Sequence, residues 1–186
     1  PVICVPSGNF GNICAGIMAW RSGLPVKHFI AACNANRVVP DYISTGNYMP
    51  QQAVATISNA MDVGDPSNLE RIRWMFGGQV QTLRPVVTAS VHTDDDVRRA
   101  LRELDASHGY LADPHTAIAY LGATEVLACD PEVHAQCLAT AHPAKFGDVV
   151  EPIIGRPVTV PAPLADAMRR PRIVEHITPD LAQLAA

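Results

Sequence analysis

Lysine is nearly absent from this chain, and its scarcity argues against several classes of function. The 186 residues include only Lys27 and Lys145 as lysines, and 14 lysines and arginines face 18 acidic residues, with a formal net charge of −4. Basic residues form no run anywhere in the sequence. Such a chain offers little for the phosphate backbone of nucleic acid or for an anionic membrane surface. We therefore expect no nucleic-acid partner.

Long hydrophobic runs and paired cysteines are also missing. No apolar stretch reaches the roughly 18 residues that a membrane-spanning helix needs, and no basic segment opens the chain as in a signal peptide. The five cysteines are odd in number, never form Cys-x-x-Cys, and mostly have apolar neighbours. This usage is typical of small core residues in a reduced protein. The sequence predicts a cytoplasmic protein with no membrane partner and no metal site.

What the chain does contain indicates a globular α/β protein. Hydrophobic residues make up 48% of it and charged residues only 17%, which favours a large buried core. Residues 2–5 and 26–32 are apolar runs typical of strands covered on both faces, and residues 13–21 between them have a helical pattern. A strand, a helix and a strand within about 30 residues predict a βαβ unit with parallel strands.

The later elements follow from start and stop signals. Thr93 and the acidic residues after it cap a helix that Gly109 ends, and Asp113 and Pro114 start another. The other predictions are helices at 52–61, 69–76, 164–170 and from 178 onward, and strands at 86–91 and 136–140. We expect an α/β fold with a mostly parallel sheet and flanking helices. Residues 1–148 would form the core, and residues 149–186 a proline-rich C-terminal wrap with a helix.

The strongest chemical signal is the segment Ser-Gly-Asn-Phe-Gly-Asn at residues 7–12, between a buried strand and the start of a helix. Backbone N–H groups at such a junction lack helical partners and lie at the positive end of the helix dipole, so they can bind a phosphate. Gly8 and Gly11 would let the ligand approach the main chain. The Gly-Lys-Ser/Thr of a Walker loop and the GxGxxG of a dinucleotide fold are absent. A small phosphomonoester fits better; from spacing alone, a glycine-rich turn that binds nothing remains an alternative.

Four segments carry a resemblance to a known family. They are PSGNFGN at residues 6–12, ATISNAMDVG at 55–64, DPHTA at 113–117 and TAHPAKF at 140–146. In amino-acid sequence and in their order along the chain, they resemble segments of the threonine synthases, which are fold-type-II pyridoxal-phosphate (PLP) enzymes. Ser-Gly-Asn alone suits several PLP enzymes, but the other three segments are far more specific. The resemblance covers nearly the whole chain, is weakest after Val149, and implies part of a tryptophan synthase β-like domain.

The resemblance implies an activity and a set of site residues. Threonine synthases convert O-phospho-L-homoserine and water to L-threonine and phosphate. The family's cofactor loop corresponds to Gly8, Asn9, Phe10, Gly11 and Asn12, which would surround the phosphate of PLP. Thr140 would bind the pyridine nitrogen, and a neutral hydroxyl there favours elimination chemistry.

Six further residues are candidates for binding the substrate. His142 and Lys145 can carry positive charge, and the small polar groups around Ser58 suit a carboxylate. Each has a simpler alternative as a cap, a turn residue or a surface charge. The candidates are Ser58, Asn59, Asp62, His115, His142 and Lys145.

The chain departs from the family pattern in one respect. Threonine synthases hold PLP as a Schiff base to a lysine in a Phe-Lys-Asp context upstream of the phosphate loop, and nothing here matches that context. We expect an inactive C-terminal portion, with no catalytic residue of its own, whose partner is the missing N-terminal part. The alternatives are another fold-type-II PLP lyase and a non-catalytic paralogue or small phosphoester-binding module.

Overall fold

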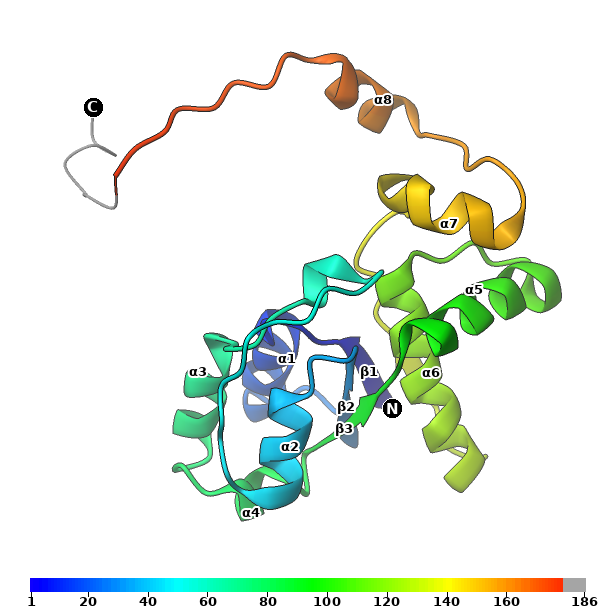
Figure 1. Cartoon of the computed structure of the whole chain (residues 1–186). Coiled ribbons are helices and arrows are strands. Elements are labelled where there is room, and N and C mark those ends of the chain that lie inside the picture. Colours follow the sequence, from blue (N-terminus) through cyan, green and yellow to red (C-terminus); the bar gives the residue numbers. More distant parts are fainter. Residues whose placement is uncertain (179–186) are drawn as a thin grey trace.

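The computed structural model describes residues 1–178, which fold around a four-stranded sheet (Figure 1). Its strand order is β3-β2-β1-β4, and every neighbouring pair is parallel. The register places Ile3 beside Phe29 and Cys4 beside Cys137. The predicted parallel βαβ unit is therefore confirmed. The strands are β1 (Val2–Pro6), β2 (His28–Cys33), β3 (Val87–Val91) and β4 (Ala135–Cys137).

The central strands are apolar except for His28 at the start of β2, because helices cover both faces of the sheet. Successive side chains of a strand point to opposite faces. In β2, Phe29 and Ala31 pack into the core on one face, whereas Ile30 and Ala32 pack into clusters on the other. All four are buried. This two-sided burial explains why an unbroken apolar run, rather than an alternating one, predicted the strand.

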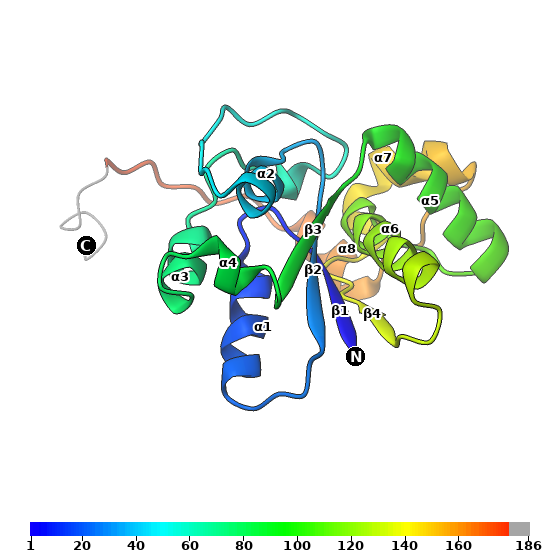
Figure 2. The ribbon, with the colours of Figure 1, turned by 90° about the horizontal axis from the view of Figure 1, so that it is seen from below.

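One face of the sheet carries α1 (Gly11–Arg21), α2 (Val38–Thr45), α3 (Asn68–Met75) and α4 (Val80–Leu83) (Figure 2). Helix α1 approaches β2 closely at Gly16, where a Cβ atom would lie 2.8 Å from the Phe29 ring. Contacts of that distance do not occur between real Cβ atoms and their neighbours. Glycine at this position therefore sets the packing distance of the helix that follows the phosphate loop.

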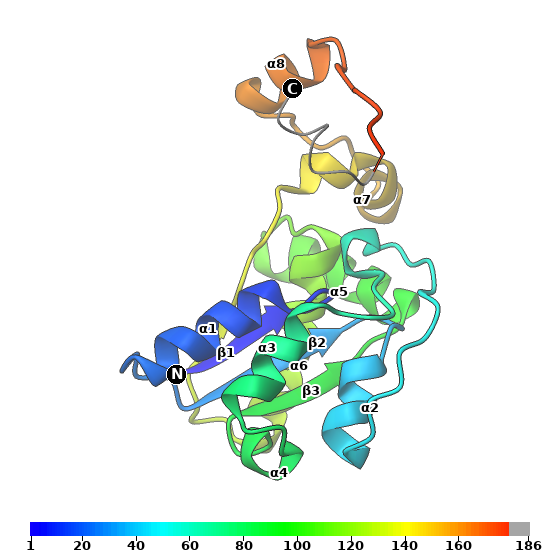
Figure 3. The same cartoon turned by 90° about the vertical axis from the view of Figure 1, so that its left-hand side faces the viewer.

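The other face carries α5 (Asp94–His108), α6 (Pro114–Cys129) and α7 (Gly147–Ile154) (Figure 2). The predicted caps are present: Thr93 and Asp96 form a capping box at α5, Gly109 ends it with φ 61°, and Asp113 caps α6. Beyond α7 the chain leaves the sheet, and α8 (Ala162–Arg169) has no buried residue (Figure 3). The short helix predicted near residues 164–170 is α8.

Several predicted elements were wrong. Residues 52–61 form no α-helix; only η1 (Asn59–Met61) is helical there. Helices α2 and α7 were not predicted, because both contain a proline. Pro40 lies in the first turn of α2, where proline is tolerated, and Pro152 lies inside α7. The strand predicted at 136–140 is three-residue β4 at the sheet edge, with two exposed residues instead of a core position. The helix predicted from residue 178 lies outside the described residues.

Candidate functional site

A cavity of about 300 Å³ lies at the carboxyl end of the sheet, between β1 and β4. The chain leaves β1 toward β2 on one side and reaches β4 on the other, so these neighbours form the topological switch point of the sheet. Open α/β sheets bind ligands at such points. The cavity is lined by Pro6, Gly8, Asn9, Phe10, Gly11, Asn12, Ala60, Met61, His115, Thr140, Ala141, Lys145 and Phe146.

The loop after β1 leaves its main-chain donors free. Ser7 N–H bonds to the Ala32 carbonyl, and the next engaged amide is that of Cys14, which bonds to the Phe10 carbonyl inside α1. Within residues 1–178, no hydrogen bond uses the N–H groups of residues 8–12. Residues 8–12 line the cavity, and their N–H groups lie at the positive end of α1. The arrangement is suited to bind an anion.

The backbone at Phe10 is strained in a way that shapes this loop. Phe10 has φ 60° and ψ 18°, and among the described residues it is the one non-glycine residue with positive φ. A left-handed residue followed by helical ones turns successive N–H groups toward a common point, which is an anion-binding geometry. The Phe10 side chain is only 4% exposed and packs in the core. That burial holds the residue in its unfavourable conformation.

Polar contacts fix the loop to its neighbours. The Ser7 hydroxyl donates to the Val5 carbonyl at 2.8 Å, so its proton is already engaged within the chain. Asn9 Oδ1 accepts from the Ser67 amide at 2.8 Å, and Asn68 Nδ2 donates to the Asn9 carbonyl at 2.9 Å. Gly8 packs against η1, where an added Cβ would lie 2.5 Å from Met61 Cα. The loop is thus held from outside while its amides stay free.

Thr140 and Lys145 reach the same cavity from the segment after β4. Thr140 follows the edge strand, and Lys145 lies in η2 (Pro143–Phe146). In the described part of the chain, neither side chain makes a hydrogen bond or an ion pair. The structure therefore places one free hydroxyl and one free ammonium group opposite the free amides of residues 8–12. Both residues remain available for a ligand.

His115 is the buried polar side chain of the cavity. It lies in the first turn of α6, is 3% exposed, and packs its ring 4.7 Å from that of Phe146 between centroids. Its Nδ1 lies 2.7 Å from Asp113 Oδ1, and its Nε2 is buried without a hydrogen-bond partner. A buried polar atom without a partner costs free energy, so such an atom calls for an explanation.

Asp113 is more than the helix cap that the sequence predicted. Its carboxylate accepts hydrogen bonds from the backbone N–H of His115, from His115 Nδ1 and from the Thr116 hydroxyl. Burial alone would raise the pKa of Asp113, but these hydrogen bonds outweigh it and hold the pKa below its ordinary value. The carboxylate is therefore ionised at neutral pH. Proximity in sequence was the only signal of this pairing.

Four of the predicted substrate residues do not line the cavity. Ser58 is fully buried, and Asp62 accepts from Asn34 Nδ2 at 2.8 Å and from the Thr56 hydroxyl at 2.7 Å in a polar network under the 51–58 segment. Asn59 is exposed at the start of η1. His142 Nδ1 caps η2 by accepting from the Ala144 amide. Their role in substrate binding stays a prediction, and each has a structural contact or position that accounts for it.

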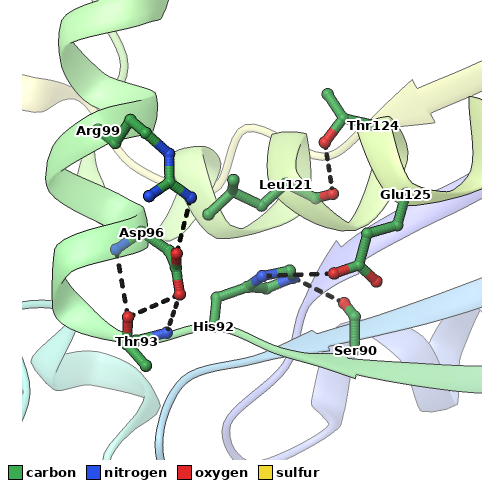
Figure 4. Close-up of polar contacts among 8 residues, drawn as sticks. All are labelled: Ser90, His92, Thr93, Asp96, Arg99, Leu121, Thr124 and Glu125. Atoms are coloured by element: carbon green, nitrogen blue, oxygen red, sulfur yellow. Dashed lines mark hydrogen bonds and ion pairs between the residues drawn. The ribbon is translucent and has the colours of Figure 1, made fainter. Parts of the chain in front are cut away.

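A second histidine cluster lies between β3 and α6 (Figure 4). His92 Nε2 is 2.9 Å from Ser90 Oγ, and His92 Nδ1 is 3.8 Å from Glu125 Oε1, beyond hydrogen-bond distance. A Cβ at Gly122 would lie 3.0 Å from Ser90 Oγ, so α6 covers this hydroxyl. The hydroxyl and the imidazole thus bond to each other beneath α6, the Glu125 carboxylate lies nearby without a hydrogen bond to the ring, and the covered hydroxyl offers no nucleophile to a ligand.

The His92 cluster predicts how stability depends on pH. Burial lowers the pKa of His92, although the charge of Asp96 opposes this effect. The folded chain therefore binds this proton less readily than the unfolded chain, and stability falls as the pH drops below the unfolded value of about 6.5. We expect His92→Gln, whose amide can still reach Ser90, to lose less stability than the wild type between about pH 7 and about pH 5.

Urea unfolding at the two pH values measures this effect. His28, whose pKa burial also lowers, supplies a matched histidine at another site, and His28→Gln should reduce the same pH dependence independently. An unchanged pH dependence in His92→Gln would contradict the assignment.

The described residues contain neither a membrane-spanning helix nor a cluster of metal ligands. No helix there is both long and apolar enough to cross a membrane. Across residues 1–178, no three His, Cys, Asp or Glu side chains lie together as a group that could hold a metal ion. The cysteines at positions 4, 14, 33, 129 and 137 are free thiols.

Comparison with known proteins agrees with the resemblance. The family model described as "Threonine synthase, C-terminal" matches residues 116–186. The threonine synthase of Serratia marcescens is 43% identical over 178 residues, covering 96% of this chain and 40% of that protein. The crystal structure of threonine synthase from Escherichia coli superposes with a TM-score of 0.86 at 39% identity, over 98% of this chain and 42% of that one.

This chain belongs to the threonine synthase family. A PLP-bound threonine synthase structure from Brucella melitensis is also similar, with a TM-score of 0.83, 29% identity and coverage of 98% of this chain and 44% of that one. The chain spans about two fifths of the length of these relatives and corresponds to the C-terminal part of a threonine synthase. The fold is that of the fold-type-II PLP enzymes, as predicted.

Proposed function

We propose that this chain is the C-terminal part of a PLP-dependent threonine synthase that forms L-threonine and phosphate from O-phospho-L-homoserine and water. The observation that carries the proposal is the cavity at the switch point, where the free amides of residues 8–12 face Thr140. The threonine synthase family depends on PLP. An enzyme of amino-acid biosynthesis of this kind would work in the cytoplasm.

The residues of the cavity fit PLP. The phosphate of the cofactor needs several donors without competing acceptors, and the amides of residues 8–12, which have no hydrogen-bond partner in the described structure, would supply them. Gly8 lets the loop pack closely against Met61, because no side chain would fit between them. Thr140 would hydrogen-bond the pyridine nitrogen from the opposite wall. When bound, PLP supplies an electron sink that stabilises negative charge on the carbons of the substrate.

The other polar residues of the cavity would hold the substrate. Lys145 is the free cation beside Thr140, and it is suited to bind the phosphate of O-phospho-L-homoserine. Lys27 does not take part in this site, because it precedes β2 at the amino end of the sheet and pairs with Asp130 at 3.4 Å. Phe146 and Met61 cover the apolar sides of the cavity and would exclude bulk water.

The test is product analysis with the polypeptide that carries this chain together with the remainder of a threonine synthase. We expect threonine and phosphate in equal amounts from O-phospho-L-homoserine, with the activity lost on removal of PLP and regained on its return. The 186-residue chain alone should release no phosphate. Phosphate release without threonine, or formation of a 2-oxo acid in its place, would contradict the proposal and favour another fold-type-II lyase.

A further inference from the structure

We propose that His115 is a general base of this site and that its Nε2 accepts the proton of the water molecule consumed in forming threonine. Asp113 would act as a positioning residue that fixes the ring in the required tautomer. This inference rests on the proposed function and adds to it the residue that activates the water.

Among the described residues that line the cavity, one side chain can act as a general base. Two titratable side chains line it, His115 and Lys145. An ammonium group has three donors and no lone pair, whereas a neutral imidazole has one acceptor nitrogen. The remaining side chains of the lining are apolar, amide or hydroxyl groups, none of which is basic near neutral pH. Within the described residues, His115 is therefore the side chain of this cavity that can take a proton.

Hydrogen bonding sets the tautomer of His115. Asp113 is fully buried, and its ionised carboxylate can only accept hydrogen bonds. The contact of 2.7 Å between His115 Nδ1 and Asp113 Oδ1 therefore places the ring proton on Nδ1. In the neutral ring, the lone pair then lies on Nε2. A buried carboxylate orients a catalytic imidazole in the same way in serine proteases.

The surroundings of His115 hold its ring at the wall of the cavity. Nε2 is buried and has no partner in the described structure, yet the residue lines the cavity. The contact with the Phe146 ring and the bond to Asp113 both hold the imidazole in this position. A water molecule or a substrate hydroxyl in the cavity would satisfy Nε2, so a role in proton transfer accounts for the unpartnered atom.

The proposed step balances in atoms and charge. The water oxygen forms a bond to the unsaturated substrate carbon left by the loss of phosphate, one O–H bond breaks, and its proton moves to Nε2. The electron pair of the carbon–carbon double bond moves to the neighbouring substrate carbon, where a proton later replaces it. The imidazolium that forms keeps its Nδ1–H bond to the Asp113 carboxylate, which stabilises the new positive charge.

The decisive variants are His115→Gln and Asp113→Asn in the holoenzyme. Asparagine is a good N-cap and should preserve α6, because its Oδ1 can still accept from both the backbone N–H and Nδ1 of His115. The neutral amide removes the negative charge that would stabilise the imidazolium. We expect both variants to lower kcat for threonine formation by about 10²- to 10⁴-fold while leaving affinity for pyridoxine 5′-phosphate within about threefold, since the phosphate amides are unchanged. The acid limb of the wild-type pH–rate profile should vanish in His115→Gln.

Thr116→Val is the matched control. It removes the other side-chain hydrogen bond to Asp113 without touching the contact with His115, so kcat should fall less than about tenfold. Imidazole ¹⁵N spectra of the chain give a readout besides activity: in the wild type, His115 should show a protonated Nδ1 and an unprotonated Nε2.

Three outcomes would overturn the inference. They are a His115→Gln enzyme with wild-type kcat and pH profile, a wild-type ring that carries its proton on Nε2, and equal losses in Thr116→Val and Asp113→Asn. A wild-type enzyme that forms threonine normally in these experiments would leave the proposed function intact. A wild type that forms none would instead contradict the proposed function itself.

Discussion

Valine in place of Gly8 should abolish binding of the cofactor's phosphate and also destabilise the fold. A Cβ at this position would lie 2.5 Å from Met61 Cα and 3.0 Å from the Met61 carbonyl carbon and oxygen, all of them backbone atoms that cannot turn aside. The loop would have to leave η1, and its amides would no longer converge. Overpacking of this kind costs about 1–3 kcal/mol of stability. Losing two charge-assisted hydrogen bonds of about 1.5–3 kcal/mol each lowers affinity by more than about 100-fold.

Gly11→Ala is the control for this experiment. Its Cβ would meet only the Asn68 side chain, at the ordinary contact distance of 3.6 Å, and alanine favours the first turn of α1 by up to about 1 kcal/mol. Urea unfolding should show no loss of stability in Gly11→Ala, and calorimetry with pyridoxine 5′-phosphate compares the affinity of the wild type with that of Gly8→Val. Equal affinity in wild type and Gly8→Val would show that the loop does not hold the phosphate.

Alanine in place of Asp62 should be among the most destabilising changes in the chain. The carboxylate accepts from Asn34 Nδ2, Asn36 Nδ2 and both the hydroxyl and the amide of Thr56. Asn34 is 1% exposed, so water cannot replace the lost partner. An unsatisfied buried donor costs about 1–3 kcal/mol, and two or more donors lose their acceptor here, so we expect a loss of about 3 kcal/mol or more in urea unfolding.

Asn59→Ala, three residues earlier in the same segment, provides the comparison. Asn59 is exposed, and no hydrogen bond of its side chain is present in the described structure, so its replacement should change stability by less than about 0.5 kcal/mol. If instead Asp62→Ala left stability unchanged and raised the KM for O-phospho-L-homoserine, the network would not be its main role. That result would place Asp62 at the substrate.

Local signals were enough to predict the parts of the fold that depend on local physics. Apolar runs flanked by turns gave β1 and β2, and the capping box at Thr93 with the left-handed Gly109 gave both ends of α5. The helix prediction for residues 52–61 failed because the conformation of this segment depends on Asp62 binding Asn34, 28 positions earlier. Helices α2 and α7 were not predicted, because each contains a proline: Pro40 lies in the first turn of α2, where proline is tolerated, and Pro152 lies inside α7.

The site could be predicted to a similar extent. The free amides of residues 8–12 follow from a strand–turn–helix junction, and the carboxyl ends of neighbouring parallel strands bring that loop and Thr140 together. The approach of Met61 to Gly8 depends on tertiary packing and had no signal in the sequence. The same holds for the unpartnered Nε2 of His115, because burial of one ring nitrogen cannot be read from residue order.

The most direct test of the central claim is an NMR titration of the ¹⁵N-labelled chain with pyridoxine 5′-phosphate, which lacks the aldehyde and cannot react with lysine. The account predicts saturable shifts of the amide signals of residues 8–12, and the same signals should shift with inorganic phosphate. The indole signals of Trp20 and Trp74 should stay in place. Binding that leaves the amides of residues 8–12 unmoved would contradict the account.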